Sequence, residues 1–177
     1  MLTIDLIDMG LPKAHRYLLG AVGPRPICFA STVDEKGVPN LAPFSFFNVF
    51  SSNPPIAVFS PSRSGRTGAH KDTFNNVKKV NEVVINLVDY SMVEQMSLAS
   101  SPYGPDVDEF IKSGLTPIES ETVKPFRVKE SPVQLECEVI EVKELGQEGG
   151  AGNLVICKIL RMHISDHILD DNQMIDQ

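Results

Sequence analysis

The stretch from Pro24 to Ser60 constrains the fold most, because two kinds of side chain alternate from one residue to the next along it. A period of two predicts β-strands, whereas an amphipathic helix would repeat every three to four residues. Residues 26–33 form the first such run, and the turn that follows ends in Gly37, which tolerates the positive φ that closes such turns. The alternation continues over 40–50, and 56–60 reads as a buried third strand. The chain is therefore predicted to open its core with an antiparallel hairpin and a third strand.

Two prolines set the character of the second strand. Pro39 and Pro43 have no N–H to donate, so this strand is predicted to lie at a sheet edge or to bend at its start. An edge leaves backbone groups free to bond the polar rim of a ring system. The hydroxyl- and cation-rich loop at 61–68 follows the third strand. Together these features suit a planar aromatic cofactor that carries a phosphate tail.

The remaining chain is predicted to alternate short helices with longer strands. The phase of the strand beginning at Val133 slips near Val139 and Ile140, which predicts a β-bulge. The glycine-rich segment 146–152 is interpreted as a flexible hairpin loop, since no helix follows it and Glu148 would repel an anion. Helices are expected at 71–80, 90–99 and 108–113, and strands at 83–87, 133–142 and 154–164.

Composition limits the class of protein. A chain of 177 residues with 42% hydrophobic content is expected to form one domain, 1–177. A formal charge of −7 argues against nucleic acid as a partner. Cys28, Cys137 and Cys157 lie in apolar strand patterns and are interpreted as inert core thiols. No membrane span or secretion signal is recognised, so the cytoplasm is the expected location.

Several motifs in a fixed order carry a family resemblance over about residues 20–170. With them, the chain resembles the flavin reductase-like family of FMN-binding split-barrel proteins. The motifs are Pro24-Arg25-Pro26, Ser31-Thr32, Gly37, Asn40-Leu41-Ala42-Pro43-Phe44-Ser45, Pro54-Pro55, Lys71-Asp72-Thr73, Val83-Val84-Ile85-Asn86-Leu87, Asp108-Glu109-Phe110, Ser113-Gly114-Leu115-Thr116 and Ser131-Pro132-Val133-Gln134-Leu135-Glu136-Cys137.

The resemblance implies a mainly β, α+β fold, namely an antiparallel split β-barrel with a few short helices. It also implies a homodimer with FMN near the subunit boundary. The segment from Ser45 to Asn48 would lie against the flavin ring. Ser31 and Thr32 are interpreted either as hydroxyl donors to the ribityl chain, which the resemblance favours, or as plain strand residues. From composition alone, the loop and helix start after residue 60 could equally be a surface loop with an ordinary N-cap at Asp72 or Thr73. The cofactor-binding residues implied are Ser31, Thr32, Ser45, Phe46, Phe47, Asn48, Ser62, Lys71, Asp72 and Thr73.

His163 is the candidate catalytic residue. It belongs to a segment that resembles the family's C-terminal His-Ile-x-Asp pattern. Its imidazole is expected either near the flavin or the incoming nicotinamide, or simply hydrogen-bonded near a strand end, and the sequence favours neither interpretation. His15, His70 and His167 do not combine with Cys or Glu at ligand spacing, so no metal site is expected.

The resemblance implies an FMN-dependent reductase that takes hydride from NADH or NADPH. The acceptor would be free flavin, a partner monooxygenase or another oxidant. No Gly-x-Gly-x-x-Gly unit is present, so the nicotinamide would stack directly on the flavin. No Ser-His-Asp set supports hydrolysis. The alternatives are an FMN-dependent electron-transfer protein, a ferric-type reductase and a non-enzymatic flavin-binding module.

Overall fold

The computed structural model of the chain describes residues 1–104 and 107–176. Its strands are β1 (Cys28–Val33), β2 (Pro39–Phe44), β3 (Phe47–Ser52), β4 (Pro55–Phe59), β5 (Glu82–Leu87), β6 (Pro117–Ile118), β7 (Arg127–Val128), β8 (Val133–Glu144) and β9 (Asn153–Ile164). Its helices are α1 (Leu11–Ala21), α2 (Asp72–Val80), α3 (Val93–Ala99) and α4 (Glu109–Ser113), with single 3₁₀ turns η1 (Tyr90–Met92) and η2 (Asp166–Ile168).

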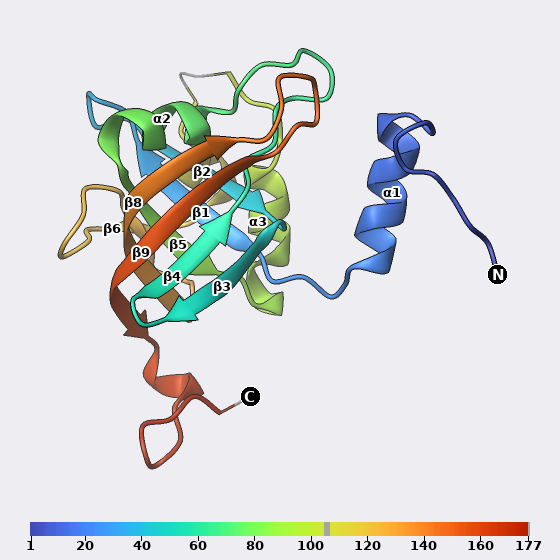
Figure 1. Ribbon diagram of the computed structural model, residues 1–177. Helices are drawn as coiled ribbons and strands as arrows, with labels where there is room; N and C mark the ends of the chain where they lie inside the picture. Colours follow the sequence, from blue (N-terminus) through green and yellow to red (C-terminus); the bar gives the residue numbers. More distant parts are fainter. Residues whose placement is uncertain (105–106, 177) are drawn as a thin grey trace.

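Seven strands form one antiparallel sheet in the order β2-β1-β5-β8-β9-β4-β3, and β6 pairs with β7 (Figure 1). The prediction of a mainly β, antiparallel fold with short helices is confirmed. β2 is an edge strand, as its two prolines predict. The expected single strand over 40–50 is wrong, because Ser45 and Phe46 divide it into β2 and β3 at opposite edges of the sheet.

This division forces the sheet to curl. β2 ends at Phe44 and β3 begins at Phe47, so the two outer edges are joined by a link of two residues. Three Cα steps span at most about 11 Å, so the edges must approach each other at that end. The sheet therefore forms a barrel that is open between β2 and β3.

The two faces of β1 pack into two separate hydrophobic clusters, as the alternation at 26–33 predicts. Cys28 and Ala30 point into the barrel, where they pack with residues such as Phe59 and Val77. Phe29 lies in a second cluster with Leu41, Met92, Ala99, Phe110, Leu115 and Val128, which links the sheet to α3, α4 and β7. The barrel is thus filled from within and braced from one side.

The three cysteines are buried and free, as predicted. Burial raises the pKa of Cys137 to about 12, and it raises the pKa of Cys28 and Cys157 as well. Thiols held in the protonated form are poor nucleophiles. They act here as small apolar side chains of the barrel core.

The bulge predicted near Val139 and Ile140 is confirmed. The register of β8 against β9 shifts between Val139 and Glu141, so Ile140 is the extra residue and its side chain is 54% exposed. A second shift opposite Glu136 and Cys137 was not predicted. Both bends help these twelve-residue strands to wrap around the core.

The helix α1 was not predicted. It stands apart from the sheet, at one side of the barrel, and none of its residues is buried (Figure 1). Among the described residues, no helix combines the length and the apolar character that crossing a bilayer requires.

Candidate functional site

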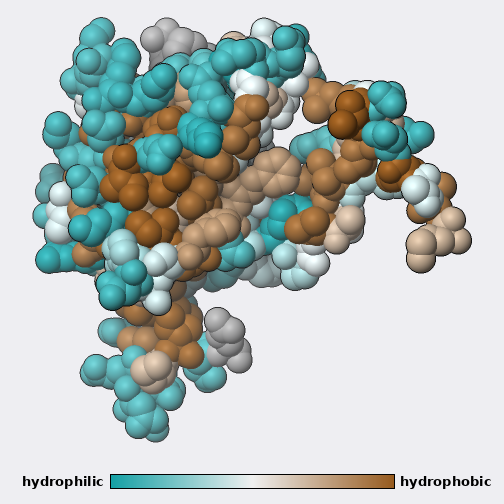
Figure 2. All heavy atoms as spheres, viewed as in Figure 1, coloured by the Kyte–Doolittle hydropathy of each residue, from teal (hydrophilic) through white to brown (hydrophobic). Residues whose placement is uncertain are grey.

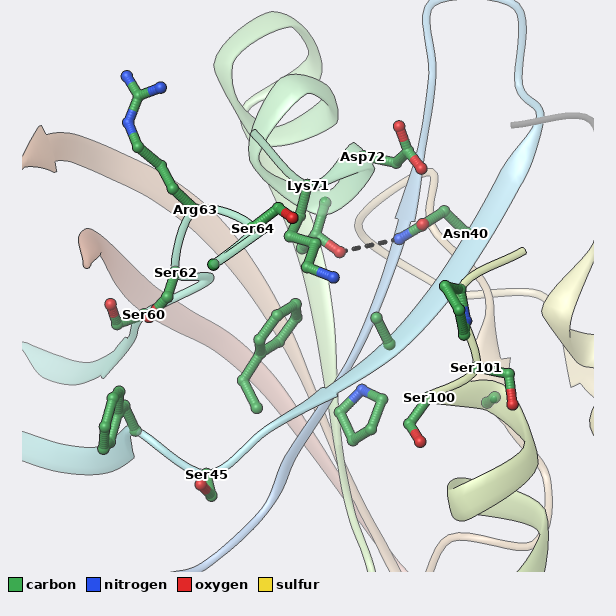
Figure 3. A pocket seen from close by; sticks show the side chains of 18 of the residues that line it. Asn40, Ser45, Ser60, Ser62, Arg63, Ser64, Lys71, Asp72, Ser100 and Ser101 are labelled. Atoms are coloured by element: carbon green, nitrogen blue, oxygen red, sulfur yellow. Dashed lines mark hydrogen bonds between the residues drawn. The ribbon is translucent and has the colours of Figure 1, made fainter. Parts of the chain in front are cut away.

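A cavity of about 570 Å³ lies at the open side of the barrel (Figure 3). Its walls come from the end of β2 and the link to β3, the loop after β4, the first residues of α2, the segment after α3, and one face of α1. These segments are far apart in sequence. The curl of the sheet and the packing of α2 and α3 bring them together.

One end of the cavity is rich in hydrogen-bond donors. Ser62, Ser64 and Arg66 line it from the loop after β4, and Lys71 lines it from the start of α2. Lys71 is the N-cap residue of α2, and no side chain caps the helix. The first N–H groups of a helix have no intrahelical acceptor and carry a partial positive charge, so this end suits an anion.

The expected N-cap role of Asp72 or Thr73 is wrong. Lys71 is the cap, and the Thr73 hydroxyl instead accepts a hydrogen bond from Asn40 Nδ2 at 2.9 Å (Figure 3). The buried Asn40 amide also donates to Thr32 Oγ1 at 3.1 Å, and so does Asn76 Nδ2. This cluster of Thr32, Asn40, Thr73 and Asn76 ties the start of α2 to β1 and β2. The start of α2, which supplies Lys71 to the donor-rich end, is therefore anchored to the sheet.

The loop after β4 is fixed by the glycine-rich loop between β8 and β9. Arg63 N–H donates to Ala151 O at 2.8 Å, and Gly150 N–H donates to Arg63 O at 3.1 Å. A Cβ on Gly149 would lie 3.0 Å from Ser64 O, so the two backbones touch. The segment 146–152, interpreted from the sequence as a flexible hairpin loop, supports the donor-rich loop directly.

The Arg63 side chain points away from the cavity centre (Figure 3). Its guanidinium donates to Glu144 Oε2 at 2.8 Å and to Gly68 O at 3.0 Å. The guanidinium beside Glu144 also lowers the pKa of that carboxyl. Arg63 thus organises the loop, and it lines the cavity together with Ser62 and Ser64.

The other end of the cavity is a sheet edge with few polar side chains. Ala42, Pro43 and Phe44 line it, and the Phe44 ring packs 5.7 Å from that of Phe59, between ring centres. Ser45 and Phe46 follow at the opening, where Phe46 is 39% exposed. Such a surface suits the face of a planar ring.

Glu109 approaches the cavity from α4. Its Oε2 accepts a hydrogen bond from Leu41 N–H at 3.2 Å. Burial raises the pKa of this carboxyl, the Leu41 bond opposes the rise, and the charges of Asp108 and Asp72 add to it. Glu109 therefore covers the backbone of an edge strand that would otherwise be open.

The structure brings together six of the predicted site residues. Those that line the cavity are Ser45, Phe46, Ser62, Lys71, Asp72 and Thr73. Ser31 and Thr32 are fully buried in β1, Phe47 packs against the barrel core, and Asn48 is exposed with its Oδ1 on Val49 N–H. Their proposed contacts with a cofactor stay predictions.

His163 does not line the cavity. It lies on β9, where Nε2 is 2.7 Å from Oε1 of the buried Glu136. Glu136 also receives N–H groups from Glu121 and Thr122. The position matches the hydrogen-bonded reading of His163, and a catalytic role for it stays a prediction.

Sequence reasoning missed several residues that line the cavity. Asn40 and Glu109 belong to motifs that carry the family resemblance, and their place in those motifs was the signal that could have identified them as site residues. His15 and Leu19 had a signal in their helical spacing on α1. The other missed residues include Ser60, Ser64, Ser100, Ser101 and Tyr103. Within residues 1–104 and 107–176, no three His, Cys, Asp or Glu side chains gather in a way that could hold a metal ion.

Comparisons with known proteins show which family the whole chain resembles. The flavin reductase like domain family matches residues 21–176. An uncharacterized protein of Halalkalibacterium halodurans is 38% identical over 159 residues, covering 89% of this chain and 76% of the relative. The structure of nitrilotriacetate monooxygenase component B from Bacillus cereus gives a TM-score of 0.91 at 32% identity, covering 99% of this chain and 86% of the other. A Shewanella frigidimarina structure with a split barrel domain gives a TM-score of 0.78 at 24% identity, covering 97% and 82%. The predicted split-barrel fold is confirmed.

Proposed function

This chain belongs to the flavin reductase-like family, and from that membership we propose that its cavity binds FMN and serves the reduction of flavin by NADH or NADPH. The family and the structural neighbours support a flavin-related oxidoreductase. The observation that carries the finer proposal is the division of one cavity into a donor-rich end and an apolar end.

The donor-rich end fits a phosphate monoester. Lys71 supplies a charge, Ser62 and Ser64 supply hydroxyls, and the uncapped start of α2 supplies backbone N–H groups. Charge-assisted hydrogen bonds of this kind are stronger than neutral ones. We therefore assign the phosphate of FMN to this end.

The apolar end fits the ring system. Ala42 to Phe44 would contact the ring face, and the backbone of Ser45 and Phe46 would lie at its polar rim. Phe46 is held in place because its carbonyl accepts from Ser60 N–H at 2.9 Å. When bound, the flavin itself supplies the two-electron acceptor. The contribution of the chain is to orient the ring, to keep one face against the sheet edge, and to exclude water there.

The electron donor and the final acceptor complete the proposal. NADH or NADPH would enter from the open side of the cavity. Free flavin or the flavin of a partner monooxygenase would then receive the electrons. A neighbour that is itself a monooxygenase component B, at 32% identity, supports a partner of that class.

We also propose that the protein acts as a homodimer. Phe50 on β3 is 69% exposed, and Leu160 and Met162 on β9 are 43% and 49% exposed. Figure 2 shows apolar side chains gathered over β9, β4 and β3. No helix among the described residues covers this face, and a second copy would remove it from water.

One experiment tests the proposal. Purified protein loaded with FMN is mixed without oxygen with NADH and, separately, with NADPH, and the flavin absorbance is followed. Rapid bleaching is the expected result. Bound flavin that stays oxidised with both nucleotides would instead favour an electron-transfer or a binding role, and a protein that binds no FMN would refute the assignment of the cavity.

A further inference from the structure

Three residues of α1 form one stripe toward the cavity. Leu11, His15 and Leu19 are spaced four residues apart, which places them on the same face of a helix. His15 and Leu19 line the cavity directly. Tyr17, two positions from His15, points elsewhere and does not line it. The stripe therefore faces the site while the rest of α1 faces outward.

Each end of the stripe is attached to a segment of the site. Leu11 packs on the glycine-rich loop so closely that a Cβ on Gly150 would lie 2.7 Å from Leu11 Cδ1. The His15 ring meets the Phe46 ring edge-on, with 6.3 Å between centres. At the other end Arg25 Nη1 donates to Leu19 O at 2.8 Å and to Val22 O, while its Nε lies 3.5 Å from Ser45 Oγ.

The contacts of α1 are made at the surface, unlike those that hold the start of α2 at the donor-rich end of the cavity. None of the residues of α1 is buried, whereas the start of α2 is fixed by the buried amides of Asn40 and Asn76. An isolated helix of eleven residues is marginal in water, so α1 depends on its few contacts with the site. Figures 1 and 2 show it standing out beside the barrel. Such a wall can yield and return without unfolding the core.

A substrate that arrives and leaves at every turnover needs a wall of this kind, whereas a retained cofactor needs rigid support. The chemistry of the stripe also suits a planar heteroaromatic ring with an amide edge. The His15 imidazole can hydrogen-bond a carboxamide, and Leu19 offers an apolar surface for the ring face.

We propose that α1 forms the wall of the second-substrate site, in which His15 and Leu19 contact the nicotinamide end of the incoming NAD(P)H. Leu11 is a positioning residue that holds α1 against Gly150 and Gly65. This inference rests on the proposed function, because it takes the apolar sheet edge at residues 42–46 as the flavin side of the cavity.

The test uses the full chain loaded with FMN. The variants are His15→Ala, Leu19→Ala and Leu11→Ala, with Tyr17→Ala as the control on the outer face. Two dissociation constants are measured by fluorescence titration, one for FMN on the apoprotein and one for unreactive NAD⁺ or NADP⁺ on the loaded protein. The KM for the reduced nucleotide is measured alongside.

We expect His15→Ala and Leu19→Ala to weaken nucleotide binding and raise KM roughly fivefold to tenfold, as for the loss of one contact. Leu11→Ala should act in the same direction by a smaller factor. FMN affinity should change less than about twofold, which is within the effect of a remote surface substitution. Tyr17→Ala should change neither constant.

Other outcomes have distinct meanings. Weakened FMN binding with unchanged nucleotide binding would overturn the inference, because α1 would then belong to the flavin site. Nucleotide constants unchanged in all three variants would overturn it too, as would a loaded wild type that binds neither nucleotide. A wild type that binds no FMN would refute the proposed function instead. Urea midpoints should stay equal across the set, since α1 contributes nothing to the core.

Discussion

Glu136 offers the sharpest quantitative prediction. Its carboxylate is completely buried on β8, yet four donors surround it. Oε1 receives Glu121 N–H at 2.9 Å and lies 2.7 Å from His163 Nε2, while Oε2 receives the N–H of Thr122 at 2.6 Å and its hydroxyl as well. Burial alone would raise the pKa of Glu136, but these hydrogen bonds together lower it from 4.5 to about 2.

The size of the effect follows from that interval. The pKa of Glu136 falls from 4.5 in the unfolded chain to about 2 in the fold. Each tenfold change in proton affinity corresponds to roughly 1.4 kcal/mol, so the ionised carboxylate stabilises the fold by about 3 kcal/mol. Because the folded-state pKa is the lower one, this contribution is fully present above pH 4.5 and is lost as the pH falls toward 2. Glu136→Gln copies the shape of the protonated acid, so it should lower the free energy of unfolding by about 3 kcal/mol at pH 7.

Urea unfolding at a series of pH values from neutral to acid measures this difference. The gap between wild type and Glu136→Gln should shrink as the pH falls below 4.5, where the wild-type carboxyl gains its proton. Glu138→Gln, two residues along the same strand and exposed, is the control and should cost less than about 0.5 kcal/mol. A gap below about 1 kcal/mol at neutral pH, or one that does not change with pH, would refute the linkage reasoning.

Three further predictions concern the site and the assembly. Lys71→Ala should weaken FMN binding by about 1–3 kcal/mol in a fluorescence titration, while Lys79→Ala on the outer end of α2 should leave it unchanged; equal effects would remove Lys71 from the phosphate site. Thr32→Val should lower the free energy of unfolding by about 1–3 kcal/mol, because the buried Asn76 amide loses its acceptor and the Asn40 amide keeps only the Thr73 hydroxyl. Ser31→Ala is its matched control and should cost nothing, since that buried hydroxyl has no partner among the described residues; a similar loss would point to packing. Phe50→Asp should halve the mass measured by light scattering if β3 lies in the dimer interface, and a dimer unaffected by it would place the interface elsewhere.

Local patterns predicted the parts of the fold that depend on local chemistry. The edge position of β2 follows from the missing N–H groups of Pro39 and Pro43. The bulge at Ile140 follows from a phase slip that is visible within one strand. Both features are properties of a few neighbouring residues, so the sequence alone is sufficient to find them.

The errors arose where long-range pairing decides the outcome. Alternation runs unbroken through 40–50, and nothing in a period of two shows that the chain changes sheet edge at Ser45 and Phe46. The partner of His163 depends on the register of β9 against β8, which sets it opposite Gln134 and next to Glu136. The stripe on α1 combines two leucines with one histidine, so its role follows only from the position of the helix beside Phe46.

The cavity exists because the sheet curls without closing. In an antiparallel pair, alternate residues of β2 turn their backbone groups toward β1 and away from it. Pro39 and Pro43 alternate with Leu41, and neither proline has an N–H to offer a further strand. The N–H of Leu41 is already taken by Glu109. β2 therefore cannot pair with β3 along its length, although the link at residues 45–46 brings their ends together. The chemistry that leaves this edge unpaired also leaves it bare beside the start of α2, and this is the space in which we propose that the flavin ring and its phosphate bind.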